Sequence, residues 1–168
     1  DGELKTAALD LPALLAAATG LGGANEKGNW SETPFAVSAW PSMIGAVSVN
    51  AGRATVFPAM RAANLRTGLR FTGNDIVAEP IDAELFGGRL SGEVVMRRGG
   101  EGLGLSGRVA LRDADVSQML SPENAAALAG RAGLQLQFEG AGLSPRALAG
   151  SLHGGGKITF DKGRIASL

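Results

Sequence analysis

The feature that most constrains the fold of this chain is an alternation of apolar and polar side chains that recurs throughout 65–168. In its first stretch, Leu69 and Phe71 fall on one side of an extended backbone, and Arg66 and Arg70 fall on the other. The same two-residue period returns in 89–97, 103–111, 131–139 and 152–160. This pattern predicts long antiparallel strands, each with one apolar and one polar face.

Glycine separates the alternating segments and predicts the turns between them. The chain holds 26 glycines in 168 residues, about twice the usual share. Turns are predicted at 50–52, 73–74, 87–88 and 98–101, with a hairpin loop at 161–163. Pro58, within a strand predicted over 53–64, and Pro80, within 75–86, each predict an edge position or a bulge.

Helical signals are few and short. Asp10 precedes Pro12 and a helical spacing of leucines in 11–18, and Ser121 and Ser144 each precede a proline. Helices are therefore expected at 11–18, 116–120, 121–129 and 144–148. The sequence predicts a single, mainly β domain over 1–168: one curved antiparallel sheet of about eight to ten strands with two to four short helices at its edges.

Composition narrows the function classes. Sixteen basic residues balance sixteen acidic ones, so the chain lacks the positive excess that nucleic-acid phosphates attract, and nucleic acid is not an expected partner. There is no cysteine for a disulfide or a thiolate metal site. No apolar run reaches the roughly 20 residues that cross a bilayer. The chain starts at Asp1 without a methionine, which suggests a piece of a longer protein.

The reactive side chains form no catalytic pattern. His153 is the only histidine and is expected to be a solvated residue on the polar face of a strand. Glu79, Asp82 and Glu84 have the chemistry of a carboxylate pair, but a charged outer face accounts for them. The glycine clusters at 99–104 and 154–157 match neither phosphate-binding motif and open onto strands. No enzyme activity, cofactor or metal is expected. The weakest alternative is a hydrolase, and hydrolase activity that His153→Ala abolishes would support it.

Several phrases, in this order, resemble the C-terminal region of the AsmA family of Gram-negative envelope proteins. They are the strand Gly2-Glu3-Leu4-Lys5 with Leu9-Asp10-Leu11-Pro12-Ala13-Leu14-Leu15, Trp30-Ser31-Glu32-Thr33-Pro34, the hairpin Leu85-Phe86-Gly87-Gly88-Arg89-Leu90-Ser91-Gly92, Gly107-Arg108-Val109-Ala110-Leu111 with Asp113-Ala114-Asp115-Val116, and the tail from Gly142-Leu143-Ser144-Pro145 to Asp161-Lys162-Gly163-Arg164-Ile165. Together these phrases cover nearly the whole chain.

The resemblance implies a periplasmic β-structure attached to the inner membrane by an N-terminal helix of the parent protein that this sequence lacks. Family members resemble bridge-like lipid carriers, in which strands curl into an open, taco-shaped groove. By this resemblance the chain would take part in phospholipid transport between the inner and outer membranes and in outer-membrane biogenesis. The outer edge of its last strand is expected to pair with adjacent segments of the parent protein.

The candidate site is the apolar stripe itself. The residues expected to contact acyl chains share one face across neighbouring strands: Leu69, Phe71, Leu90, Val94, Met96, Leu105, Val109, Leu136 and Phe138. Few helices are available to cover this face, and its small residues, including Gly92 and Gly107, are expected to leave room for a guest. The alternative is a scaffold that supports outer-membrane protein assembly and whose stripe is a closed, dry core.

Overall fold

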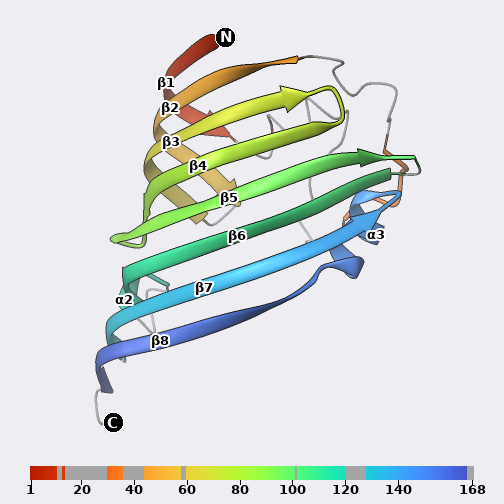
Figure 1. The fold of residues 1–168 in the computed structure, drawn as a ribbon. Helices are drawn as coiled ribbons and strands as arrows, with labels where there is room; N and C mark the ends of the chain where they lie inside the picture. The colour runs from red at the N-terminus through yellow and green to blue at the C-terminus, as the bar shows by residue number, and fades with distance from the viewer. Residues whose placement is uncertain are drawn as a thin grey trace.

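The computed structural model describes residues 1–10, 13, 30–35, 44–57, 60–100, 102–119 and 128–165, and they contain one eight-stranded sheet (Figure 1). The strands follow one another in chain order across the sheet: β1 (Gly2–Asp10), β2 (Ile44–Phe57), β3 (Met60–Thr72), β4 (Asp75–Leu85), β5 (Gly88–Gly99), β6 (Gly102–Asp115), β7 (Leu128–Gly142) and β8 (His153–Ile165). The helices are α2 (Val116–Met119) and α3 (Pro145–Ser151). The predicted mainly β architecture, with a curved and open sheet, is confirmed.

Strand direction departs from the prediction at one edge. From β2 to β8 every neighbouring pair is antiparallel, but β1 runs parallel to β2, with Gly2 opposite Val47 and Asp10 opposite Thr55. Parallel neighbours need a crossover of about a dozen residues or more, and the segment 11–43 separates these two strands. The sheet is therefore mixed.

Two predicted turns are strand. Asn50, Ala51 and Gly52 lie inside β2 and pair with β3, so β2 ends only at Phe57 and the predicted strand 53–64 does not exist as one element. Likewise, the predicted hairpin at 161–163 is absent, because β8 continues through it with Asp161 opposite Arg131. In both cases pairing with a long neighbouring strand outweighs the local turn signal.

The other turn signals mark turns, two of which have bounds that differ from the prediction: Gly88, Arg98 and Gly99 belong to β5, and the turns there are at 86–87 and at Gly100. Gly73 has a φ of 84° in the β3–β4 turn, and Phe86 and Gly87, with φ of 50° and 66°, form the two-residue β4–β5 turn. The β4 register shifts between Ala78 and Ile81, around the predicted bulge at Pro80.

Two of the predicted helix caps, at Ser144 and Asp10, are present. The Ser144 side chain accepts a hydrogen bond from the Ala147 amide, 3.2 Å away, at the start of α3. The Ala13 amide donates to Asp10 Oδ1 at 2.9 Å, as the predicted cap requires, but the rest of 11–18 lies outside the described residues. The expected helix at 121–129 also lies outside them up to 127, and its last two residues belong to β7.

The main core lies where the strands bend. Asn64 in β3 and Asp113 in β6 have left-handed φ values of 52° and 55°, and the strand register shifts beside each of them. Next to these bends a cluster of buried residues forms: Ala51, Ala54, Ala62, Leu65, Ala83, Leu85, Leu111 and Ala114. Its alanines allow close backbone approach, so a small core closes one end of the curved sheet.

Candidate apolar binding face

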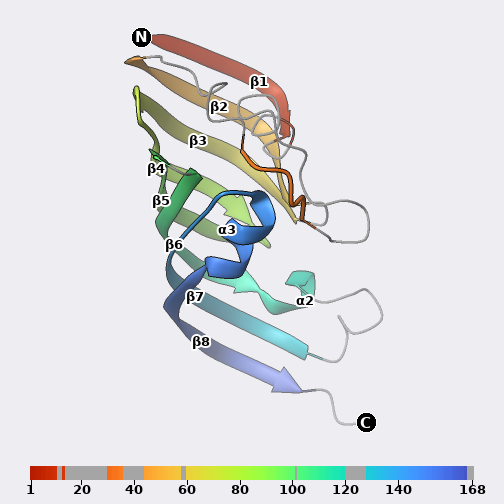
Figure 2. The same ribbon diagram turned by 90° about the vertical axis from the view of Figure 1, so that its right-hand side faces the viewer.

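The sheet is curved, and α2, α3 and residues 30–35 lie on its concave side (Figure 2). Phe35 and Leu148 pack there with Met96, so the apolar side chains of the strands face this concave side. Strand register aligns its residues: Phe71, Ile76, Met96 and Leu105 form one row across four strands. A second row, from β3 to β7, is Leu69, Ala78, Val94, Gly107 and Phe138. We call this surface the concave apolar face.

All nine residues predicted to contact acyl chains lie on the concave apolar face. Six of them stand in these two rows, and the other three, Leu90, Val109 and Leu136, lie an even number of residues from row members on the same strands. None of the nine is buried. Leu136 is 38% exposed and the other eight are half-buried. These side chains therefore keep apolar surface that the described part of the chain leaves uncovered.

Protein covers the two ends of the concave apolar face. At the bent end, Leu90 of β5 packs against the main core. At the other end, Phe35 and Leu103 are buried together, and Met96 of β5 and Leu148 of α3 pack against them. The Phe35 amide donates to the Leu143 carbonyl at 2.8 Å, which fixes residues 30–35 beside α3. The part that the described residues leave uncovered is the middle, where Val94, Val109, Leu136 and Phe138 lie.

The glycines of this face do not act as predicted. A Cβ added at Gly92, Gly107, Gly154 or Gly156 would lie 2.0–2.8 Å from a carbonyl oxygen of the neighbouring strand. Their lack of a side chain therefore permits close strand approach. The space above them is partly occupied as well, because the Phe138 ring lies within 2.8 Å of the position that a Cβ of Gly107 would take.

The opposite, polar face is held by ion pairs between neighbouring strands. Arg108 Nη2 lies 2.6 Å from Glu93 Oε1, and Arg97 Nε lies 2.9 Å from Asp75 Oδ1. The carboxylates weighed as a catalytic pair are engaged in the same way: Glu79 pairs with Arg70, Asp82 pairs with Arg89, and Glu84 accepts from Asn64. Hydrogen bonds from Arg97 and Arg89 lower the pKa values of Asp75 and Asp82. These groups form a charged outer face.

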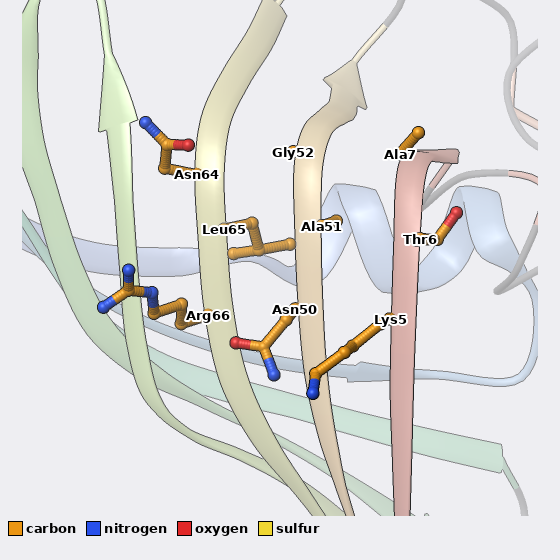
Figure 3. Close-up of a pocket in the computed structure, with 9 residues that line it drawn as sticks. All are labelled: Lys5, Thr6, Ala7, Asn50, Ala51, Gly52, Asn64, Leu65 and Arg66. Carbon is orange, nitrogen blue, oxygen red and sulfur yellow. The ribbon is translucent and has the colours of Figure 1, made fainter.

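Sequence reasoning missed a hollow of about 550 Å³ beside the parallel pair β1 and β2 (Figure 3). Lys5, Asn50 and Arg66 point along one side of it, and Ala51 and Leu65 lie at its base. It depends on β1 lying next to β2, which no local pattern indicates. It is open, and no acidic side chain lines it.

His153 is exposed on the polar face, as predicted. Its Nδ1 lies 2.9 Å from the Ser151 carbonyl oxygen, and its Nε2 lies 3.2 Å from Glu139 Oε1. The Ser151 hydroxyl is engaged elsewhere: it accepts from the Ala141 amide and donates to the Leu148 carbonyl, each at 2.9 Å. His153 is thus not placed to activate that hydroxyl as a nucleophile.

The contacts of His153 raise its pKa above the ordinary value of about 6.5, first through the Ser151 carbonyl and then through Glu139. Because the folded chain favours the imidazolium, this interaction stabilises the fold below that value and is lost as pH rises through the raised pKa. An NMR titration of the single histidine measures it directly. Glu139→Gln should lower the pKa only in part, since the Ser151 contact stays; a wild-type pKa at or below 6.5 would contradict this assignment.

Among the residues described, no group of three or more histidine or acidic side chains could hold a metal ion. No helix found there is long and apolar enough to cross a membrane. Comparison of the chain with models of protein families, with curated proteins and with solved structures gives no match. The concave apolar face is therefore the feature on which a functional hypothesis must rest.

Proposed function

We propose that this chain is a non-enzymatic, AsmA-like part of a Gram-negative envelope protein, in which the concave apolar face binds the acyl chains of phospholipid. In this proposal it lies in the periplasm, attached to the inner membrane through the parent protein, and serves phospholipid transport to the outer membrane. The observation that carries the proposal is the uncovered middle of the face, where Leu136 keeps 38% of its surface exposed.

The apolar character of the concave face supports a lipid guest. At about 25 cal/mol per Å², an acyl chain that shelters a few hundred Å² gains several kcal/mol before ordering costs. The rows of side chains run across neighbouring strands, so a flexible chain can follow them without a specific polar contact. The opposite face, by contrast, carries ion pairs between neighbouring strands, such as Arg89 with Asp82 and Arg108 with Glu93.

A scaffold that supports outer-membrane protein assembly is the second candidate. It is favoured by the two covered ends of the face, where Leu111 belongs to one buried cluster and Leu103 to the other. If the middle of the concave apolar face is covered in solution as its two ends are, its side chains form an ordinary dry core. The sheet would then bind partners through its edge strands.

Binding of a phospholipid with a fluorescent acyl chain tests the proposal. Leu136→Asp puts a carboxylate into the exposed middle of the concave apolar face and should weaken binding by about tenfold or more. Gln135→Asp is the matched control: it adds the same charge at the adjacent residue, which is exposed on the polar face, and should leave binding unchanged.

Native mass spectrometry of the gently purified chain provides an independent readout. Phospholipid that co-purifies with the wild type but not with Leu136→Asp supports the proposal. A wild type that neither carries nor binds phospholipid, or equal losses in Leu136→Asp and Gln135→Asp, overturns it in favour of the scaffold.

A further inference from the structure

The strand β8 ends the sheet as an edge with large apolar side chains. Among the described residues it is hydrogen-bonded to β7 alone. Ile158 and Phe160 are 62% and 68% exposed, although they continue the concave apolar face beside Leu134 and Ala132. An edge of this kind has free backbone donors and acceptors and can pair with another strand.

The sequence of β8 is complementary to itself in one antiparallel register. Opposite residues of an antiparallel pair project to the same face of the sheet. If Thr159 lies opposite Thr159 of a second copy, Ile158 falls opposite Phe160 and Lys157 falls opposite Asp161. The two-fold axis repeats both pairings, which gives two ion pairs on the polar face and two apolar pairs on the concave face.

Other registers of the same pairing lose these contacts. A two-fold axis between two residues would put polar side chains opposite apolar ones. An axis on Lys157 puts two ammonium groups opposite each other, and an axis on Ile158 puts Lys157 opposite Thr159 and Asp161 opposite Gly155. Lys157 and Asp161 are themselves exposed, and neither forms an ion pair with any described residue. Both charges are thus available to a partner strand.

We propose that two copies of this chain pair through β8, antiparallel and centred on Thr159. The pairing joins two eight-stranded sheets edge to edge, so that the concave apolar faces of the two copies become continuous. It covers part of Ile158 and Phe160, two large apolar side chains of that strand that are exposed in the single chain. The inference concerns self-association and does not depend on lipid binding.

Charge exchange tests the register. Sedimentation velocity over micromolar to submillimolar concentrations should show a monomer–dimer equilibrium for the wild type. Lys157→Asp and Asp161→Lys each place like charges opposite one another twice and should weaken dimerisation by about tenfold or more. The double variant Lys157→Asp/Asp161→Lys restores opposite charges in the same register and should recover the dimer.

The opposite edge supplies the control. Lys5→Asp changes an equally exposed lysine on β1 and should leave the dimer intact, and circular dichroism should show every variant folded. A wild type that stays monomeric throughout, a dimer that both single variants retain, or a double variant that fails to recover overturns the proposal. Loss of association in Lys5→Asp alone would also overturn the proposal, because it would assign the contact to β1 at the opposite edge of the sheet.

Discussion

Leu111→Ala should lower the free energy of unfolding by about 2–5 kcal/mol, the largest single-residue effect that we expect in this chain. Leu111 is 5% exposed and belongs to the main core together with Leu65, Leu85 and Ala114. Truncation removes buried methyl groups and leaves a cavity. Most of the other buried core residues are alanines, whose side chains cannot rearrange to fill it. Chemical denaturation followed by circular dichroism measures the change.

Leu136→Ala is the control, and it also tests the open face. Leu136 lies on the same concave face as Leu111, but in its uncovered middle, so its truncation should cost about 1 kcal/mol or less. Equal costs for the two leucines would mean that the middle of the face is covered in solution. In that case the lipid proposal would lose its main support, whereas the dimer proposal would not.

The sequence predicted most of this fold because the two-residue period is a local property of each strand. From β3 to β8 the apolar alternation places Leu69, Val94 and Phe138 on one face, and strand register aligns them as expected. Turns that need a positive φ were also predictable: Gly73 and Gly87 adopt one. Local chemistry alone decides these features.

The features that the sequence did not predict depend on neighbours far along the chain. Asn50-Ala51-Gly52 has turn chemistry, yet β1 and β3 pair with β2 on both sides there, and Ala51 is buried. A Cβ added at Gly52 would lie 3.2 Å from the Ala7 carbonyl oxygen, so this glycine permits the approach of β1. The parallel direction of β1 relative to β2 is a further feature that strand periodicity does not encode.

The predicted site shows the same division. Alternation assigned nine side chains to one face correctly, because facing is fixed by parity along each strand. The sequence did not predict that protein covers the two ends of the concave apolar face. At one end the cover consists of Phe35 and Leu148 packed with Leu103, and these residues are far apart in the sequence. The role of the glycines was misjudged for a related reason: Gly92 and Gly156 lie close to the backbone of a neighbouring strand, and alternation along one strand does not reveal that distance.

Covering of one end depends on how closely α3 approaches β7. A Cβ added at Gly142 would lie 2.3 Å from the Leu148 amide nitrogen and 2.8 Å from its Cα. Gly140 has a similar position, 3.0 Å from the Leu152 backbone. The helix thus lies directly on the glycine backbone of β7, and this contact brings Leu148 to Leu103 and Phe35.

Gly142→Ala should therefore lower the free energy of unfolding by about 1–3 kcal/mol, because the added methyl group forces α3 away from β7. Gly150→Ala is the matched control: the same substitution within α3 meets no atom within 4 Å and should stabilise the chain by up to about 1 kcal/mol through helix propensity. Hydrogen exchange should show faster opening of α3 only in Gly142→Ala. Equal stabilities for the two variants would contradict the close contact, and with it the view that α3 closes this end of the concave apolar face.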